Sequence, residues 1–278
     1  MPFRPGNLAA RKGLLRMKLC MMSCCMSGTP QEVADAAVRC GMTGIDWVHT
    51  ADLPTKDLRK ISADAGLEVV SFTTLDERVT HLRADRHAAC REILDLAFAS
   101  GAGEVMLPPF AADGAAGKEE ALARWIEFYA QAAGLAAEAG ITITFETSPA
   151  LACPVFLPED ALRVLDAVPG IRMVFDQGNM AIAADPIAAF DRLKDRVIRF
   201  HLKDFVLSPE PRAGYTSRHG KHYRFELIGR GSLDIAGFWR HVPGPWRDLY
   251  ATPETNDPTG AIPAPEAIRR VSRDLVQW

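Results

Sequence analysis

Short runs of β-branched and apolar residues alternate with longer amphipathic stretches along nearly the whole chain, and this alternation limits the folds that the chain can adopt. Several amphipathic stretches end on a glycine just before the next apolar run, as at Gly41, Gly66, Gly101 and Gly140. Glycine is typical of helix C-caps because it adopts the left-handed conformation without a steric penalty. The pattern therefore predicts strands and helices in strict alternation.

Eight strands and eight helices are predicted from this alternation. The strands are expected at residues 17–24, 44–49, 67–73, 104–108, 141–147, 171–177, 197–204 and 248–254, and the helices at 29–40, 55–65, 80–100, 117–139, 158–168, 185–195, 232–242 and 264–276. Pro30, after Thr29, suits a first helical position, and Ser232 is a candidate N-cap.

Strict alternation implies parallel strands joined by right-handed crossovers. Eight such units in a chain of 278 residues match the α/β class and a single-domain (β/α)8 TIM barrel, which usually needs about 250 residues. We expect the barrel over residues 17–278. A doubly wound open sheet is the alternative, although no G-x-G-x-x-G motif follows the first strand.

Residues 1–16 carry four basic side chains and no acidic one. This composition resembles a transit peptide or a translated upstream extension before a start at Met17. We favour a poorly ordered N-terminal extension that does not belong to the barrel.

The charge, hydropathy and cysteine content indicate which partners and which cellular compartment to expect. Thirty-two basic and 35 acidic residues give a net charge of −3, so no global positive field favours nucleic acid as a partner. No run of 18 apolar residues occurs, so we expect no membrane-spanning segment. The six cysteines form neither a disulfide framework nor paired C-x-x-C zinc motifs, which favours reduced thiols and a cytoplasmic protein.

Polar residues end four successive strands in the second half of the chain. These strands read ITITFETS, IRMVFDQGN, VIRFHLKD and LYATPETN, and they carry Glu146, Asp176, His201 and Glu254. Each residue alone is typical of a helix N-cap or a solvated loop. In a barrel, however, they would converge on the catalytic mouth and repel each other without a cation. We therefore predict one divalent ion, Mn²⁺, Mg²⁺, Co²⁺ or Zn²⁺.

The motifs FETS, FDQGN, HLKD, IGRGSLD and PETN, in this order, resemble the xylose isomerase-like TIM barrels, a superfamily of sugar phosphate isomerases and epimerases. The resemblance covers residues 17–278 and implies that Glu146, Asp176, His201 and Glu254 are the metal ligands. Dehydratases of keto-inositols and endonuclease-IV-type enzymes share this fold. Homo-oligomers also occur in the superfamily.

The chain departs from its relatives at several positions. Asn179 stands where many of them carry a histidine, and His49 where many carry a glutamate. Tyr223 and Phe225 replace the Asp-x-His that endonuclease-IV-like enzymes use for a further zinc. These differences argue against a trinuclear zinc cluster and an abasic-site endonuclease.

Five residues are candidates for substrate binding. Lys203 shares a strand face with His201, so it either binds a substrate oxygen or pairs with a ligand carboxylate. Trp47 suits a wall for a sugar ring or a core position, and His49 a pocket or a structural role. Asn179 follows the Asp176 strand, and Arg224 resembles a substrate-facing arginine of the epimerases. The long, basic segment after residue 204 is either a lid or a solvated surface.

The leading hypothesis is a divalent-metal-dependent sugar or sugar phosphate isomerase or epimerase. Glu146 and Glu254 would remove and return a proton α to a carbonyl, through an enediolate. A metal-dependent dehydratase of a keto-polyol shares the first step and is the alternative. A barrel that binds a carbohydrate without converting it is the third hypothesis.

Overall fold

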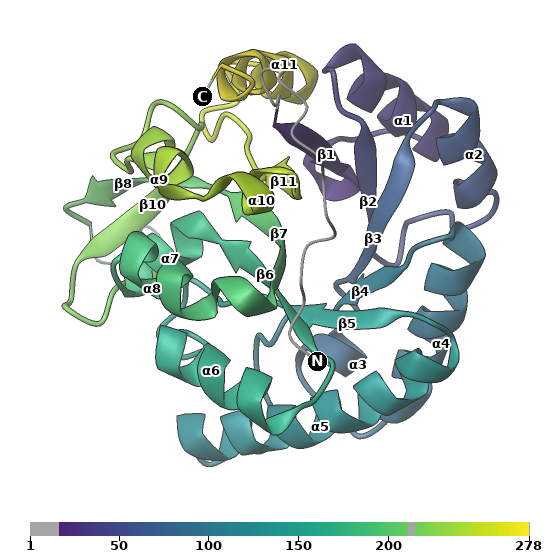
Figure 1. Ribbon diagram of the computed structural model, residues 1–278, viewed down its shortest axis with the longest axis vertical. Coiled ribbons are helices and arrows are strands. Elements are labelled where there is room, and N and C mark those ends of the chain that lie inside the picture. Colours follow the sequence, from purple (N-terminus) through teal and green to yellow (C-terminus); the bar gives the residue numbers. More distant parts are fainter. Residues whose placement is uncertain (1–16, 211–214, 278) are drawn as a thin grey trace.

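The computed structural model describes residues 17–210 and 215–277, and it contains a closed barrel of eight parallel strands (Figure 1). The predicted single-domain (β/α)8 architecture is confirmed, whereas the proposed extension at 1–16 lies outside the described residues. The strands follow one another around the barrel as β1 (Lys18–Met22), β11 (Tyr250–Pro253), β7 (Val197–Leu202), β6 (Arg172–Asp176), β5 (Thr142–Phe145), β4 (Glu104–Met106), β3 (Glu68–Thr74) and β2 (Gly44–His49).

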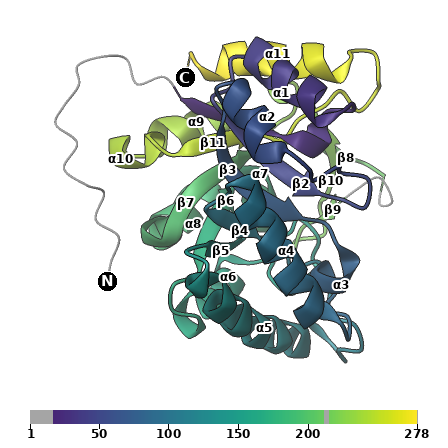
Figure 2. The same ribbon diagram turned by 90° about the vertical axis from the view of Figure 1, so that its right-hand side faces the viewer.

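Helices surround the barrel and cover its outer face (Figures 1 and 2). They are α1 (Pro30–Arg39), α2 (Leu58–Asp64), α3 (Glu77–Thr80), α4 (Arg86–Ser100), α5 (Lys118–Glu138), α6 (Pro158–Ala167), α7 (Gln177–Ala183), α8 (Pro186–Leu193), α9 (Ile235–His241), α10 (Gly244–Arg247) and α11 (Ala264–Leu275), with short 3-10 turns η1 (Ser23–Cys25) and η2 (Lys194–Arg196). No helix within the described residues is long and apolar enough to cross a bilayer.

The helix boundaries follow local capping chemistry. Thr29 and Glu32 form a capping box at the start of α1, with Pro30 in the first turn as expected. Gly41, Gly66, Gly101 and Gly140 all have a positive φ, which confirms them as helix-terminating residues.

Three helix predictions need correction. The helix expected at 80–100 is divided into α3 and α4, and Leu82 between them has a φ of 50°. The short helix α7 begins directly at the end of β6 and was not predicted. Asp234, rather than Ser232, caps α9, because its carboxylate accepts the backbone N–H of Gly237.

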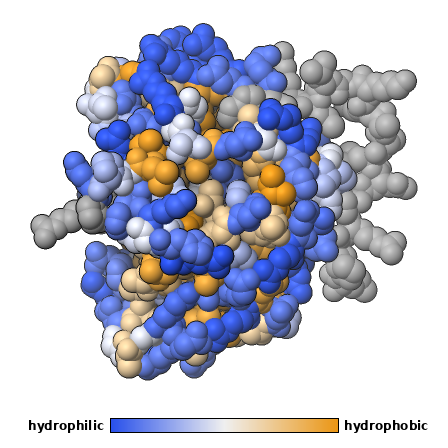
Figure 3. Space-filling view, turned by 90° about the vertical axis from the view of Figure 1, so that its left-hand side faces the viewer, coloured by the Kyte–Doolittle hydropathy of each residue, from blue (hydrophilic) through white to orange (hydrophobic). Residues whose placement is uncertain are grey.

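The long segment after β7 is not a structureless loop. It contains the small antiparallel sheet β8 (Asp204–Ser208), β10 (His222–Glu226) and β9 (Tyr215–Thr216), in that spatial order. One face of the sheet packs through Phe205, Tyr215, Tyr223 and Phe225 against Phe156 and neighbouring residues. The side of the molecule that carries this sheet is mostly hydrophilic with small apolar patches (Figure 3).

Side chains alternate between the two faces of each barrel strand. Outward-facing residues such as Phe72, Phe145, Phe175 and Phe200 pack against the helices in one continuous core. The barrel interior is more polar, and its upper part, at the C-terminal strand ends, holds the predicted ligands.

Candidate metal centre

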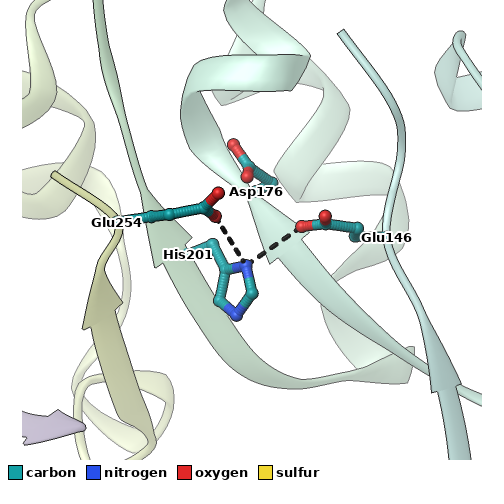
Figure 4. Close-up of side chains that lie close together, drawn as sticks. All are labelled: Glu146, Asp176, His201 and Glu254. Atoms are coloured by element: carbon teal, nitrogen blue, oxygen red, sulfur yellow. Dashed lines mark hydrogen bonds and ion pairs between the residues drawn. The ribbon is translucent and has the colours of Figure 1, made fainter. Parts of the chain in front are cut away.

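Glu146, Asp176, His201 and Glu254 converge at the C-terminal mouth of the barrel (Figure 4). Asp176 and His201 belong to β6 and β7, while Glu146 and Glu254 directly follow β5 and β11. We call these four residues the metal centre. Asp176 is also the N-cap of α7, where one carboxylate oxygen accepts the backbone N–H of Asn179 at 2.8 Å. This cap fixes the direction of the carboxylate.

The four side chains lie close enough to share one ion. Each offers a ligand atom, and these atoms lie within 4.8 Å of one another. The Nδ1 atom of His201 lies 3.0 Å from Glu146 Oε2 and 3.4 Å from Glu254 Oε2. Nδ1 is therefore the imidazole nitrogen that faces the carboxylates.

Lys203 is the cation next to the metal centre. Its Nζ lies 2.9 Å from Asp176 Oδ2 and 2.9 Å from Glu254 Oε2. The structure thus places Lys203 in contact with two of the predicted ligand carboxylates, which matches the ion-pair alternative given above.

Burial and the neighbouring charges shift the pKa values of Asp176, His201 and Glu254. Burial, together with Glu146 and Glu254, raises the pKa of Asp176 to about 7 against the opposing effect of Lys203. Burial alone would raise the pKa of Glu254, but Lys203 and His201 outweigh it and lower the pKa to about 2. Burial opposes the charged form of His201, yet Glu146 and Glu254 raise its pKa to about 9.

The donor set fits a divalent cation. Asp176 Oδ2 and Glu254 Oε2 are buried oxygens that accept no hydrogen bond from the described residues, although the Lys203 ammonium lies nearby. Three carboxylates face the ammonium of Lys203 and the protonated ring of His201, so the group has one surplus negative charge when all three carboxylates are ionised. Oxygen ligands with one imidazole suit Mn²⁺, Mg²⁺, Co²⁺ or Zn²⁺. The metal centre therefore has both the geometry and the unsatisfied lone pairs that a cation would use.

A second charged group lies deeper in the barrel. The guanidinium of Arg199, which is fully buried, donates to Asp46 Oδ2 at 2.7 Å, to Glu104 Oε1 at 3.0 Å and to Ser71 Oγ at 3.0 Å. We call Asp46, Ser71, Glu104 and Arg199 the arginine layer. Its signal in the sequence is a charged residue inside an apolar strand, as in GIDWVH and VIRFHLKD, and the predicted site does not include these residues.

The arginine layer contacts the metal centre through His201. Arg199 Nη1 lies 3.2 Å from His201 Nε2. The guanidinium packs against the Nε2 edge of the ring, while Nδ1 faces the carboxylates. Arg199 is therefore a positioning residue for His201.

Asn179 is a second residue that supports the metal centre. It is fully buried, and its side-chain Nδ2 donates to the backbone carbonyl of Thr147 at 2.7 Å. Its backbone N–H binds Asp176, as described above. The residue holds the chain after β5 against α7 and has no exposed surface for a substrate.

Trp47 and His49 lie on the helix-facing side of β2, away from the barrel interior. Trp47 is fully buried, and its Nε1 donates to Ser62 in α2 at 3.0 Å. The ring of His49 stacks on Phe72 with 5.8 Å between centroids. Trp47 thus has the core position of its two alternatives, and His49 is half-buried beside Phe72. Contact of either residue with a substrate stays a prediction.

Arg224 also lies apart from the metal centre. It is on β10, opposite Val206, and therefore on the face of the small sheet that is opposite to Phe225. Its side chain is 60% exposed, and its nearest acidic partner is Glu226 at 3.9 Å. Contact of Arg224 with a substrate therefore stays a prediction. Asp204 shares its face and is structural, because it accepts the backbone N–H groups of Gly229 and Gly231.

Comparison with known families places the fold. A sequence profile described as xylose isomerase-like TIM barrel matches residues 34–275. A search of curated proteins by sequence finds no significant match.

Solved structures with the same fold cover nearly the whole chain. The IolI protein, solved with a bound zinc atom, has a TM-score of 0.74 at 16% identity, covering 94% of this chain and 98% of its own. A probable 3-DHS dehydratase, AsbF from Bacillus anthracis, has a TM-score of 0.70 at 18% identity, with 93% and 98% covered. The 3-keto-D-glucoside 4-epimerase YcjR from E. coli has a TM-score of 0.69 at 15% identity, with 94% and 99% covered.

Proposed function

Because this chain belongs to the xylose isomerase-like TIM barrel family, we propose that it is a divalent-metal-dependent isomerase or epimerase of a sugar or sugar derivative. The observation that carries the proposal is the convergence of Glu146, Asp176, His201 and Glu254 within 4.8 Å, with buried oxygens left without hydrogen bonds. Mn²⁺, Mg²⁺, Co²⁺ and Zn²⁺ all suit this donor set.

Glu254 is the best candidate for the base that removes the α-proton. Its side chain is 28% exposed, compared with 10% for Glu146, and it borders an open cavity. Its lowered pKa keeps the carboxylate ionised at neutral pH, so no proton has to leave Glu254 before it can act as a base. When bound, a divalent cation would polarise the substrate carbonyl and acidify the neighbouring C–H, which a weak carboxylate base requires.

Glu146 would act on the opposite side of the substrate. Glu146 and Glu254 follow non-adjacent strands, so their carboxylates approach the mouth from different directions (Figure 4). One carboxylate would take the proton and the other would return one, which inverts a carbon centre through an enediolate. Lys203 would hold Glu254 and Asp176 in place through its two ion pairs.

Reaction in deuterated water tests the proposal. Mn²⁺-loaded protein is incubated with a panel of ketoses, and the products are analysed by NMR and mass spectrometry. We expect deuterium at the α-carbon of a product with an unchanged mass formula. Glu254→Gln should lower the rate about 10²- to 10⁴-fold while metal binding persists in weakened form.

Other outcomes would identify the competing functions. Loss of water from the substrate would indicate a dehydratase, as AsbF, a probable 3-DHS dehydratase, is described to be. A purified protein without divalent metal, whose Glu146→Gln variant retains sugar affinity, would indicate a carbohydrate-binding barrel. Either result contradicts the proposed isomerase or epimerase.

A further inference from the structure

A cavity of about 460 Å³ opens beside Glu254. Small-molecule sites in proteins have volumes of about 300–1,000 Å³, so the cavity suits a small ligand. Its lining comes from η1 and the residues after it, from β10, and from the chain after β11. The cavity borders the metal centre, because Glu254 belongs to both.

One side of the cavity is apolar and rich in sulfur. It is formed by Cys24, Cys25, Met26 and Phe225. We call these four residues the cavity wall. Three of them come from the run SCCM, the part of the sequence where cysteines and methionines are most crowded. Soft, polarisable side chains of this kind pack well against apolar groups and rings.

The cavity wall is held in place from both ends. The hydroxyl of Ser23, at the start of η1, accepts the backbone N–H of Val48 in β2 at 2.8 Å. The ring of Phe225 packs edge-on against Phe205, with 5.9 Å between centroids. The wall is thus preorganised, which lowers the entropic cost of binding a ligand against it.

The charges around the cavity favour a neutral ligand. Glu254 is the single charged residue among the described residues that line it, and Thr255 and Asn256 add neutral polar groups. The Lys203 ammonium already contacts two carboxylates. Three ligand carboxylates, one lysine and a divalent cation sum to zero charge, so the loaded site would have no surplus positive charge for a phosphate.

We infer that the cavity wall receives an apolar, uncharged carbon group of the substrate, at the end of the sugar remote from the metal centre. A deoxygenated carbon or an aglycone has this chemistry. Its burial against Met26 and Phe225 contributes binding energy in proportion to the area covered. A phosphate at the same place would lose hydration without gaining a charged partner. The inference rests on the proposed function, because it assigns the substrate class of the same site.

Matched ligands test this inference by equilibrium binding to Mn²⁺-loaded protein. For each ketohexose of a panel, the parent sugar is compared with its 6-deoxy and 6-phosphate derivatives. In the series that binds most tightly, we expect the 6-deoxy sugar to bind at least as tightly as the parent and the phosphate at least about tenfold more weakly. A phosphate that binds as tightly as the parent sugar overturns the inference, and so does a panel without any binding sugar.

Substitutions of residues that line the cavity distinguish the effect of apolar contact on sugar binding from the effect of charge. Phe225→Ser should abolish the preference for the 6-deoxy sugar, whereas the matched Phe225→Leu should retain it. Asn256→Lys should raise affinity for the phosphate, and Asn256→Gln should not. Unchanged preferences in both Phe225→Ser and Asn256→Lys would contradict the inference.

The failure of the proposed function gives a different result. Mn²⁺ binding to the wild-type protein is measured before any sugar is added. Lack of Mn²⁺ binding contradicts the metal-dependent function. The parent sugar and its 6-deoxy and 6-phosphate derivatives are then compared on the metal-free protein, because the cavity wall contains none of the four predicted metal-binding residues. Mn²⁺ binding together with a preference for the phosphate contradicts the inference about the wall alone.

Discussion

The barrel interior holds two neighbouring groups of buried charge, the arginine layer and the metal centre, and they differ in how their charges are balanced. In the arginine layer, Asp46 accepts hydrogen bonds from Arg199 and from both the backbone and hydroxyl of Thr73. Glu104 accepts from Arg199 and Thr144. Among the described residues, this layer has no buried side-chain oxygen without a partner.

The metal centre is built from similar residue types but is left incomplete. Six buried side-chain oxygens within the described residues have no hydrogen bond, and two of them are Asp176 Oδ2 and Glu254 Oε2. All six belong to β6 or β11 or to the residues just after β5, β6 and β11. Buried carboxylates are costly unless they are paired. The buried oxygens of the arginine layer all have hydrogen-bond partners, so we expect this layer to stabilise the barrel. The metal centre has buried oxygens without such partners next to an open cavity, so it is suited to bind a cation.

The largest effect on stability is expected from a substitution in the arginine layer. Arg199→Met leaves Asp46 and Glu104 buried without their cation, so we expect a loss of about 3–5 kcal/mol in the free energy of unfolding of the metal-free protein. Urea denaturation measures it. The matched control Arg240→Met removes an exposed arginine and should change stability by less than about 0.5 kcal/mol. A similar small effect for Arg199→Met would refute the structural role of the layer.

Next in size is the removal of one ligand charge. Asp176→Asn keeps an N-cap for α7 but loses a carboxylate, so metal affinity should fall at least about 100-fold. Stability of the metal-free variant should be equal or higher, because burial disfavours the ionised Asp176. Isothermal titration with Mn²⁺ and urea denaturation measure the two effects.

The matched control for this substitution is Asp185→Asn, which alters the exposed N-cap of α8. Its Mn²⁺ affinity should equal that of the wild type. If both variants bind Mn²⁺ as tightly as the wild type, Asp176 is not a ligand.

The pH dependence of metal affinity is a smaller effect. His201, with a pKa of about 9, and Asp176, with a pKa of about 7, must both lose a proton before they bind a cation. Affinity should therefore rise with pH, by up to about tenfold per unit between these two values and more steeply below the lower one. Calorimetric titrations with Mn²⁺ in buffers of different ionisation enthalpy would count the protons released. An affinity that does not change with pH would contradict the prediction that His201 and Asp176 bind the metal.

The smallest expected effect removes one hydrogen bond of the arginine layer. Ser71→Ala deletes the hydroxyl that accepts from Arg199 Nη2, which still donates to Glu104. We expect a loss of about 1 kcal/mol in stability and an unchanged Mn²⁺ affinity. A marked loss of Mn²⁺ affinity would show that the two groups are energetically coupled rather than separate.

Local sequence alone determined the architecture and the identity of the four converging residues. Glycines such as Gly41 and Gly101 terminate helices because of backbone sterics, and this effect needs no tertiary context. Alternating elements of regular length then permit few topologies, and a parallel barrel brings the ends of its strands to one mouth. For this reason the sequence alone groups Glu146, Asp176, His201 and Glu254.

Only the tertiary structure decided which other residues contact the site. Trp47 and His49 have suitable side chains, but the register of β2 turns them toward the helices. Arg224 belongs to β10, where it pairs with Val206 of β8 and lies on the face of the small sheet opposite to its neighbour Phe225; the packing of Phe225 decides which face that is. The arginine layer and the cavity wall join residues far apart in the chain. Their contacts depend on strand register and side-chain packing, which a single sequence does not encode in any local pattern.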